Sequence, residues 1–553
     1  MENINNPEKE DEGVAQNGSE SNDALESTKT EQKAVKPVKK YVRPLVKELH
    51  EKEGLKSLVE AIGYIDFIDV FHTNEDTKEK VAELREALKN EKNLKDQILL
   101  RNELKVYMPD TEDCYIMLIE EILRIADEVG LGIGTSEDGN FPYFYNGCYW
   151  EQMSKSLSRE FIMEVGGNSG FGYYYTRKLK ISDALYKQFV LLQSISSKHE
   201  DNVVKINLLN GTFVIREDSR GLHSFDKSDF FKYQLSFDYD VDAKAPKFQA
   251  FLDRFLPERE SQMILMEYLG YVFTNHLKME KCLVLYGSGS NGKSVIFDIV
   301  AALLGEENIC SYTLSNLCTE NGYFRAQLSN HLLNYSSELG GRNTNADVIK
   351  KLISNEPIDA RSPYSDPFIL RNYCKFLFNA NTLPNQMENT DAYFRRFIIL
   401  EFKEKVTEEE MDVDFAKKII KDELSGIFNM VLEGLDRILI NKKFTESKKA
   451  KEFLENVKRE NNNVAMFMED MGYEKTTSPG ILLKELRDRY YTYCQENNIH
   501  YRLGPKKFSE AIESLGYTIV RKGTNNENRV LCGFRKTGIG KEIEDIFGIS
   551  PEL

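Results

Sequence analysis

The chain begins with a stretch that has few apolar residues, and a stretch with a helical apolar period follows it. Residues 1–32 carry almost no large apolar side chains and are rich in Glu, Asn and Ser, so burial cannot offset the cost of ordering them. We expect residues 1–45 to form a solvated tail and linker. From residue 46 to about 105, apolar residues recur every three or four positions among charge pairs four residues apart, which predicts a helical segment over 46–110.

The pattern becomes mixed between residues 111 and 255. A helical period in CYIMLIEEILRIADEVG precedes an aromatic, strand-like stretch from Phe141 to Trp150, and a second helical period lies near 181–197. The alternating sequence VVKINLLNGTFVI then predicts strands. Together these signals predict an α+β domain over 111–255.

The middle of the chain predicts a parallel sheet. Helical, strand and loop signals alternate over 256–402, as they do where crossover helices join parallel strands. A helical connector rich in Lys and Glu follows at 403–478, then a compact unit at 479–540 and an acidic tail at 541–553. The predicted fold class is therefore a multidomain α/β protein.

One local motif carries the strongest chemical signal. In KCLVLYGSGSNGKSVIFDIVAALLG, an apolar run meets a GxxxxGK[ST] pattern and then an amphipathic helix, the context that a phosphate-binding loop requires. Backbone N–H groups and the helix N-terminus cradle phosphates in such a loop, while the Lys reaches the β- and γ-phosphates and the Ser hydroxyl binds Mg²⁺. The predicted nucleotide-binding residues are Gly287, Ser288, Gly289, Ser290, Asn291, Gly292, Lys293 and Ser294.

Polar residues at the ends of later apolar strands point to a hydrolase. Glu338 ends the strand of HLLNYSSELGG, where a carboxylate can polarise water or hold Mg²⁺. Asn381 ends the strand of YCKFLFNANTLP and can orient the attacking water, and paired Arg395 and Arg396 precede the strand of FIILEF. A guanidinium there can stabilise charge on a neighbouring subunit's γ-phosphate. No NKxD-like guanine-reading motif is found, which disfavours a GTPase.

The ordered set resembles the superfamily 3 helicases, in particular the primase-helicases of phages, plasmids and poxviruses, a branch of the AAA+ ATPases. The resemblance covers roughly residues 112–540 and includes the block from VIKKLISNEP to FRRFIILEF. It implies an N-terminal helicase-associated domain, a P-loop AAA+ motor and a C-terminal winged helix. It further implies ATP and Mg²⁺ as cofactors, and a hexamer. The implied catalytic residues are Glu338, Asn381 and Arg396 or Arg395, the finger acting in trans, with Ser294 and Glu338 as the metal-binding residues.

Two features depart from the family pattern. Ser354-Asn355-Glu356 replaces the usual Gly-Gly-Asp-like triplet. Asp66 and Asp69 in YIDFIDVF are not the closely paired aspartates of a primase-polymerase, and no zinc-binding Cys set is present. The sequence therefore favours the helicase half without a recognisable primase.

DNA-binding residues are expected in two places. By resemblance, a hairpin between the Glu338 and Asn381 strands projects into the channel of the ring, and the matching segment offers Lys350, Lys351, Arg361 and Tyr364, cations for phosphates and an aromatic for a base. The C-terminal unit reads helix, helix, strand, strand, the order of a winged helix. Over 501–540 it has eight Lys or Arg against three Glu, and its expected DNA contacts are Lys506, Lys507, Arg521 and Lys522.

Composition sets limits on the class of protein. The 553 residues carry a net charge of −16, and the excess acid lies partly in the two tails. The eight Cys show no metal-ligand or disulfide spacing, and no transmembrane segment or signal peptide is found. We expect a cytoplasmic protein with no membrane partner. The acidic charge argues against a generally sticky nucleic-acid binder, but not against a motor that confines DNA to its channel.

The sequence thus predicts an ATP-dependent, hexameric DNA helicase for replication of a phage, plasmid or mobile element. Its partners would be single-stranded and forked DNA and replication proteins such as a polymerase or single-strand binding protein. Two alternatives remain: a bifunctional primase-helicase with a divergent primase site, and a DNA-binding initiator that uses ATP as a switch without translocating.

Overall fold

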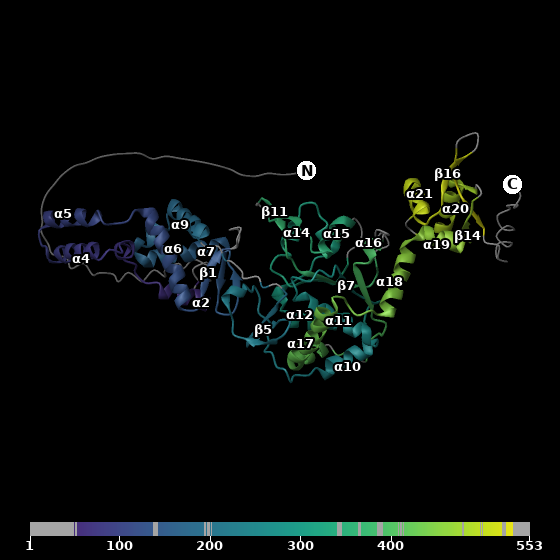
Figure 1. Ribbon diagram of the computed structural model, residues 1–553, viewed down its shortest axis with the longest axis horizontal. Helices are drawn as coiled ribbons and strands as arrows, with labels where there is room; N and C mark the ends of the chain where they lie inside the picture. The colour runs from purple at the N-terminus through teal and green to yellow at the C-terminus, as the bar shows by residue number, and fades with distance from the viewer. Residues whose placement is uncertain are drawn as a thin grey trace, which may run out of the picture.

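The structure, a computed structural model, describes most of the chain. The described residues are 49, 52–135, 142–192, 195, 200, 202–339, 345–362, 366–383, 391–407, 409, 412, 414–477, 480–497, 499, 502–522 and 527–534. It is a mixed α/β protein with a helical N-terminal body, a central body built on a parallel sheet, and a small C-terminal body (Figure 1). In the part of the chain that the structure describes, no helix is both long and apolar enough to cross a membrane.

The N-terminal body packs helices around one small antiparallel sheet. Its core joins apolar residues from Leu49 to Phe189, and the α4–α5 hairpin stands away from it (Figure 1). A π-helical turn, Gly167–Phe171, connects α7 to α8. The elements are α2 (Glu53–Ala61), α3 (Phe67–Phe71), α4 (Glu75–Asn90), α5 (Leu94–Lys105), α6 (Thr111–Glu128), β1 (Gly132–Thr135), β2 (Pro142–Tyr145), β3 (Trp150–Gln152), α7 (Lys155–Gly166), α8 (Tyr173–Thr176) and α9 (Leu179–Leu192).

A second antiparallel sheet leads into the central body. Its strands follow the order β4-β5-β6, and their apolar side chains join the core of the central body. The bounds are β4 (Val204–Leu208), β5 (Gly211–Ile215) and β6 (Arg220–His223), followed by a short 3-10 turn at Lys227–Asp229.

The central body is built on a five-stranded sheet in the order β13-β7-β12-β9-β8, with all neighbouring pairs parallel. Near-continuous apolar runs such as the buried Cys282–Leu285 form these strands because both faces of a parallel sheet are covered. The bounds are β7 (Cys282–Tyr286), β8 (Ile309–Cys310), β9 (Leu333–Ser336), β12 (Lys375–Ala380) and β13 (Phe397–Glu401).

Helices cover this sheet at close range. Gly270 and Gly434 lie where α11 and α17 cross: a Cβ on Gly434 would lie 2.5 Å from the backbone carbon of Met266, so only glycine allows this approach. The buried carboxylate of Glu423 in α17 accepts hydrogen bonds from two backbone N–H groups at the start of α10. The helices are α10 (Pro246–Phe255), α11 (Arg259–Val272), α12 (Lys293–Leu304) and α17 (Phe415–Asn441), with a 3-10 turn at Glu306–Asn308.

Shorter elements lie between the central strands. Strands β10 and β11 form an antiparallel hairpin, which follows α15 and precedes β12 in the chain. In space, β11 and α14 lie at one edge of the central body (Figure 1). The bounds are α13 (Leu314–Leu317), α14 (Tyr323–Ala326), α15 (Ala346–Ile353), β10 (Ile358–Arg361), β11 (Pro367–Leu370) and α16 (Asp391–Phe394).

The C-terminal body follows the long helix α18 (Figure 1). Its own core packs three helices against two small sheets, in the orders β15-β17-β16 and β14-β18. The bounds are α18 (Lys448–Asn461), α19 (Asn463–Asp470), β14 (Tyr473–Lys475), β15 (Ile481–Leu482), α20 (Leu483–Glu496), α21 (Pro505–Ser514), β16 (Ile519–Lys522), β17 (Glu527–Val530) and β18 (Cys532–Phe534).

The buried cores divide the chain differently from the boundaries expected from composition. The first part of the expected helical segment 46–110, up to Phe67, shares one core with the front of 111–255, and this core ends near residue 190. The strands from 204 to 223 and helix α17 belong instead to the core of the central sheet. Local patterns mark where helices and strands lie, but which faces they bury together depends on tertiary packing.

Candidate functional site

A glycine-rich loop joins the end of β7 to the start of α12. At Gly287, an added Cβ would lie 1.8 Å from Asn291 Nδ2 and 2.6 Å from the Phe402 carbonyl oxygen, so no side chain fits there. Gly292 has φ +81°, and a Cβ there would also meet the Phe251 ring at 2.9 Å. The chain therefore uses glycine at both positions to place its backbone against the neighbouring strand and helix.

Lys293, the first residue of α12, is held beneath this loop. It is 6 % exposed, and its Nζ donates to the Gly287 carbonyl at 2.7 Å and to Asn291 Oδ1 at 2.8 Å. Asn291 is fixed in turn, because its Nδ2 donates to the Phe402 carbonyl at 3.0 Å. Burial lowers the pKa of Lys293. A buried cation beside unpaired helix N–H groups suits a polyphosphate.

A pocket of about 640 Å³ opens above the loop. One part is polar, formed by the loop and the strand ends, and the other is apolar, formed by Phe251, Phe255 and Phe415 with Val406. The Val406 N–H donates to the Ser290 carbonyl at 2.7 Å, which ties the two parts together. The lining residues are Phe251, Arg254, Phe255, Gly289, Ser290, Asn291, Gly292, Lys293, Ser294, Val295, Asp298, Ser337, Asn379, Asn381, Val406, Asp412, Phe415 and Ala416.

Asn381 lies beside the loop because β12 is the neighbour of β7. Ala380 pairs with Tyr286, and the Gly287 N–H donates to the Ala380 carbonyl at 3.0 Å. Asn381 follows directly and lines the pocket. Asn379 lines it too and accepts a hydrogen bond from the Tyr335 hydroxyl at 3.0 Å. The sequence predicts Asn381 as a site residue because it ends the strand. It does not predict Asn379, because only the fold shows that this residue faces the pocket.

Acidic residues approach the pocket from different elements, among them Glu338, Asp298 and Asp412. Glu338 is exposed and lies two residues beyond β9, next to the lining residue Ser337. Its backbone N–H donates to Ser336 Oγ at 3.4 Å. Asp298 of α12 lines the pocket, and burial together with the nearby charge of Glu306 raises the pKa of its carboxyl. Sequence reasoning missed Asp298, which reads as an ordinary polar position of an amphipathic helix.

The arginine pair lies at the opposite end of the sheet. β13 runs parallel to β7 with Phe397 opposite Cys282, so Arg395 and Arg396 lie near the start of β7, whereas the loop follows its end. Five residues of strand span roughly 17 Å. Within one chain, the structure therefore does not bring either guanidinium to the pocket.

The two arginines differ in their surroundings. Arg396 is 7 % exposed, donates from Nε to Ser354 Oγ at 3.2 Å, and also bonds to the Ala392 carbonyl. The Arg395 side chain is 64 % exposed. Both lie near Glu280, with nitrogen-to-oxygen distances of 3.5 and 3.6 Å. Arg395 is therefore much the more exposed of the two.

The expected channel residues lie on α15 and the β10–β11 hairpin. Lys350 pairs with Asp347 at 2.8 Å, while Lys351 and Arg361 are exposed. Tyr364, the fourth residue expected there, lies outside the described residues.

Arg325 anchors the base of this hairpin. Its buried guanidinium donates to the Asp359 carbonyl at 2.7 Å and to the Thr319 carbonyl at 2.7 Å. A lone Arg in YFRAQL carries no sequence signal for this role, which requires the hairpin to be folded beside α14.

The C-terminal residues expected to meet DNA occupy two elements. Lys506 and Lys507 are exposed at the start of α21. Arg521 is exposed on β16 and donates to Asn528 Oδ1 at 3.3 Å. The side chain of Lys522 lies outside the described residues, although its backbone belongs to β16.

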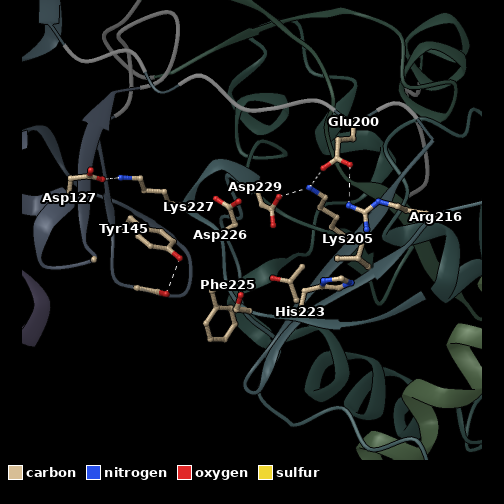
Figure 2. A pocket seen from close by; sticks show the side chains of 15 residues that line it. Asp127, Tyr145, Glu200, Lys205, Arg216, His223, Phe225, Asp226, Lys227 and Asp229 are labelled. Atoms are coloured by element: carbon tan, nitrogen blue, oxygen red, sulfur yellow. Dashed lines mark hydrogen bonds and ion pairs between the residues drawn. The ribbon is translucent and has the colours of Figure 1, made fainter. Parts of the chain in front are cut away.

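A second polar pocket of about 580 Å³ lies between the two antiparallel sheets. Its charges are paired internally, as Figure 2 shows: Lys205 bonds to Glu200 and Asp229, each at 2.5 Å, and Lys227 bonds to Asp127. Although burial opposes it, these carboxylates raise the pKa of Lys205. The cations of this pocket are therefore already neutralised, unlike Lys293. In the described part of the chain, no group of three or more His, Cys, Asp or Glu is placed to hold a metal ion.

Two family models match parts of the chain. Residues 123–257 match the model described as D5 N terminal like, and residues 285–396 match a family of unknown function, DUF5906. The first match supports, for the region in front of the glycine-rich loop, the expected relation to phage primase-helicases.

The solved structures that match this chain do so at low similarity. An A-form apo structure of the NrS-1 C-terminal region is 14 % identical with a TM-score of 0.43, and it covers 74 % of this chain and 98 % of that one. A second apo structure of this region is 14 % identical with a TM-score of 0.39, covering 77 % and 100 %. Likeness at this level does not extend to function.

Proposed function

We propose that the protein is an ATP-driven DNA helicase, a superfamily 3 type motor that serves replication of a phage, plasmid or mobile element. The observation that carries this proposal is the convergence of Lys293, Ser294 and Asn381 on one pocket, with Glu338 at its edge. These residues come from a glycine-rich loop and two strand ends of one parallel sheet. Ligands of such sheets bind outside the carboxyl ends of the strands.

ATP fits the two parts of the pocket. The triphosphate would lie over the loop, where the N–H groups at the start of α12 and the Lys293 ammonium neutralise its charge. Bound phosphate oxygens would offset the desolvation that lowers the pKa of Lys293. The apolar part, with Phe251 and Phe255 on one helix, would take the base.

The donor set also fits Mg²⁺. Magnesium usually keeps several waters and binds one or two protein oxygens plus substrate phosphates, so a three-residue acidic cluster is not required. The exposed hydroxyl of Ser294 and the carboxylate of Glu338 would hold it. When bound, the ion would neutralise charge that develops on the phosphates. Glu338 and Asn381 would orient the attacking water.

The hydrolytic site would be completed by a second copy. Because Arg395 and Arg396 lie at the far end of their own sheet, a finger must come from a neighbouring subunit. The exposed Arg395 suits that role, whereas buried Arg396 would hold the turn before β13 in position. A site shared between subunits implies a ring, and a hexamer is the form that the family resemblance suggests.

DNA would be held by the exposed cations of the hairpin region and the C-terminal body. Lys351 and Arg361 would contact one strand in the channel. In the C-terminal body, helices α20 and α21 precede the paired strands β16 and β17, which supports a winged helix in which Lys506 and Lys507 would meet duplex or forked DNA.

Steady-state ATP hydrolysis by the full chain tests the proposal. We expect turnover that rises when single-stranded DNA is added, because movement along the strand couples the two sites. Lys293→Ala should abolish both rates while thermal unfolding stays unchanged, and Lys451→Ala, an exposed lysine far from the loop, should behave as wild type. Turnover that persists in Lys293→Ala would place the site elsewhere.

A further inference from the structure

The π-helical turn Gly167–Phe171 and its flanking glycines, Gly166 and Gly172, form a second glycine-rich loop, at residues 166–172 of the N-terminal body, and aromatic rings near it are exposed to solvent. Tyr173 and Tyr174 follow it directly and are 53 % and 84 % exposed, although large aromatic side chains usually lie buried. Tyr64, 77 % exposed, lies against the same loop, since a Cβ on Gly170 would be 3.0 Å from its ring. We call these three residues the tyrosine patch.

The loop is built to hold these rings in place. Gly170 has φ +113° and Gly172 has φ +85°, so the chain turns sharply out of α7. The Ile65 N–H donates to the Ser169 carbonyl at 3.2 Å, which fixes Tyr64 beside the loop. Buried Thr176 donates to the Met163 carbonyl at 3.0 Å, so α8 is tied back to α7.

Cations surround the patch. The Arg177 guanidinium lies 3.7 Å from the centre of the Tyr173 ring and is held by Glu160 and Glu164. Next to it, Lys178 and Lys180 are exposed. Residues 173–187 contain four Lys or Arg against one Asp, in a chain whose net charge is −16. Local positive charge in an acidic protein therefore coincides with its exposed rings.

We propose that the tyrosine patch is a stacking platform for single-stranded DNA, separate from the channel residues of the motor. Exposed rings accept bases of any sequence, and the neighbouring lysines neutralise the strand's phosphates. Rings fixed before binding lose little conformational freedom when a base stacks on them. The choice of DNA as ligand rests on the proposed function, but the ATP site has no part in it.

Fluorescence anisotropy of the full chain without nucleotide tests the platform. The probes are a labelled thymidine oligonucleotide and an abasic strand of equal length and charge. We expect Tyr64→Ala/Tyr174→Ala to weaken binding to the thymidine strand by roughly 5- to 50-fold. Binding to the abasic strand should change little, so the wild-type preference for bases should largely disappear. Ile440→Ala, a truncation of an equally exposed residue on α17, is the control.

A second variant tests whether the lysines beside the tyrosine patch contact the phosphates of the strand. Lys178→Glu/Lys180→Glu should weaken binding to both strands and reduce its salt dependence, whereas Lys417→Glu should do neither. Unchanged DNA affinity in both patch variants would overturn the proposal, and loss of a protein partner with intact DNA affinity would make the patch a protein-docking surface instead. Because the readout needs no ATP hydrolysis, failure of the motor assignment would not produce either result.

Discussion

Two glycine-rich loops in this protein have similar compositions and opposite surroundings. The loop at 287–292 follows a buried strand and leads into a twelve-residue helix, and the cation behind it, Lys293, is buried and bonded. The loop at 166–172 follows a helix and leads into the four-residue α8, and it exposes tyrosines and lysines. Glycine permits the turn in both, but the preceding and following elements decide what each turn presents.

If both proposals hold, one acidic chain binds two anionic ligands in different ways. A loop backed by a buried cation and a helix N-terminus would hold a compact polyphosphate. An exposed platform takes an extended strand that continues past it on both sides. We therefore expect damage to the first loop to abolish chemistry and damage to the second to weaken DNA binding only.

After the complete loss expected for Lys293→Ala, the largest effect should come from Arg395→Ala, which tests whether the enclosed site needs a second copy. We expect turnover to fall about 10³-fold with ATP binding retained, because a finger in trans stabilises the transition state. Arg124→Ala, an exposed arginine of α6, should have no effect.

A mixing experiment sharpens this prediction. Arg395→Ala and Lys293→Ala copies, each inactive alone, should recover turnover when mixed, since some interfaces then join an intact Lys293 to an intact Arg395. Arg396→Ala should instead lower the melting temperature through loss of its bonds to Ser354 and Ala392. No recovery on mixing, with full loss in Arg396→Ala at unchanged stability, would contradict the assignment.

Glu338→Gln should have the next largest effect. Turnover should fall at least about 10²-fold while ATP binding persists, because the amide cannot accept the proton of the attacking water. Asp298→Asn is the matched comparison, because it changes an acid that lines the same pocket from a helix. If Asp298→Asn is inactive and Glu338→Gln active, the acid of the site has been misassigned.

Matched glycine substitutions compare the two loops directly. Gly292→Ala places a Cβ against Phe251 at φ +81°, and Gly170→Ala places one against Tyr64 at φ +113°. Strain of this kind costs about 1–2 kcal/mol. A loop that relaxes to relieve it must regain the strained geometry to bind, which lowers affinity by roughly tenfold. Isothermal titration should show weaker ATP binding only in the first variant, and anisotropy weaker DNA binding only in the second. Equal losses of both ligands in both variants would break the comparison.

The smallest effect concerns a second buried lysine. Lys375 of β12 lies over the Tyr271 ring at 4.4 Å, and burial lowers its pKa to about 8. A lowered pKa means that the unfolded chain binds more protons, so this residue makes stability rise as pH increases through 8. Between pH 7 and 9, wild type should gain about 1 kcal/mol relative to Lys375→Met, a difference that thermal melts at each pH measure. A difference independent of pH would contradict the lowered pKa.

Sequence reasoning worked best where chemistry is local. The glycine-rich loop and the strand ends at Glu338 and Asn381 are contiguous signals, so their positions could be predicted before the fold was known. The exposure of side chains could not be predicted, because two adjacent arginines look alike in sequence. In the fold, Arg396 is packed against Ser354, whereas Arg395 is exposed. The tyrosine patch was missed for the same reason: Tyr64 lies against Gly170, and only the fold brings these two distant parts of the chain together.

Strand displacement on a forked DNA without any origin sequence tests the central claim most directly. The account predicts ATP-dependent unwinding by the full chain, none with Lys293→Ala, and none with a nonhydrolysable ATP analogue. Binding of the fork with ATP hydrolysis but no strand displacement would contradict the account, and would favour an initiator that uses ATP as a switch.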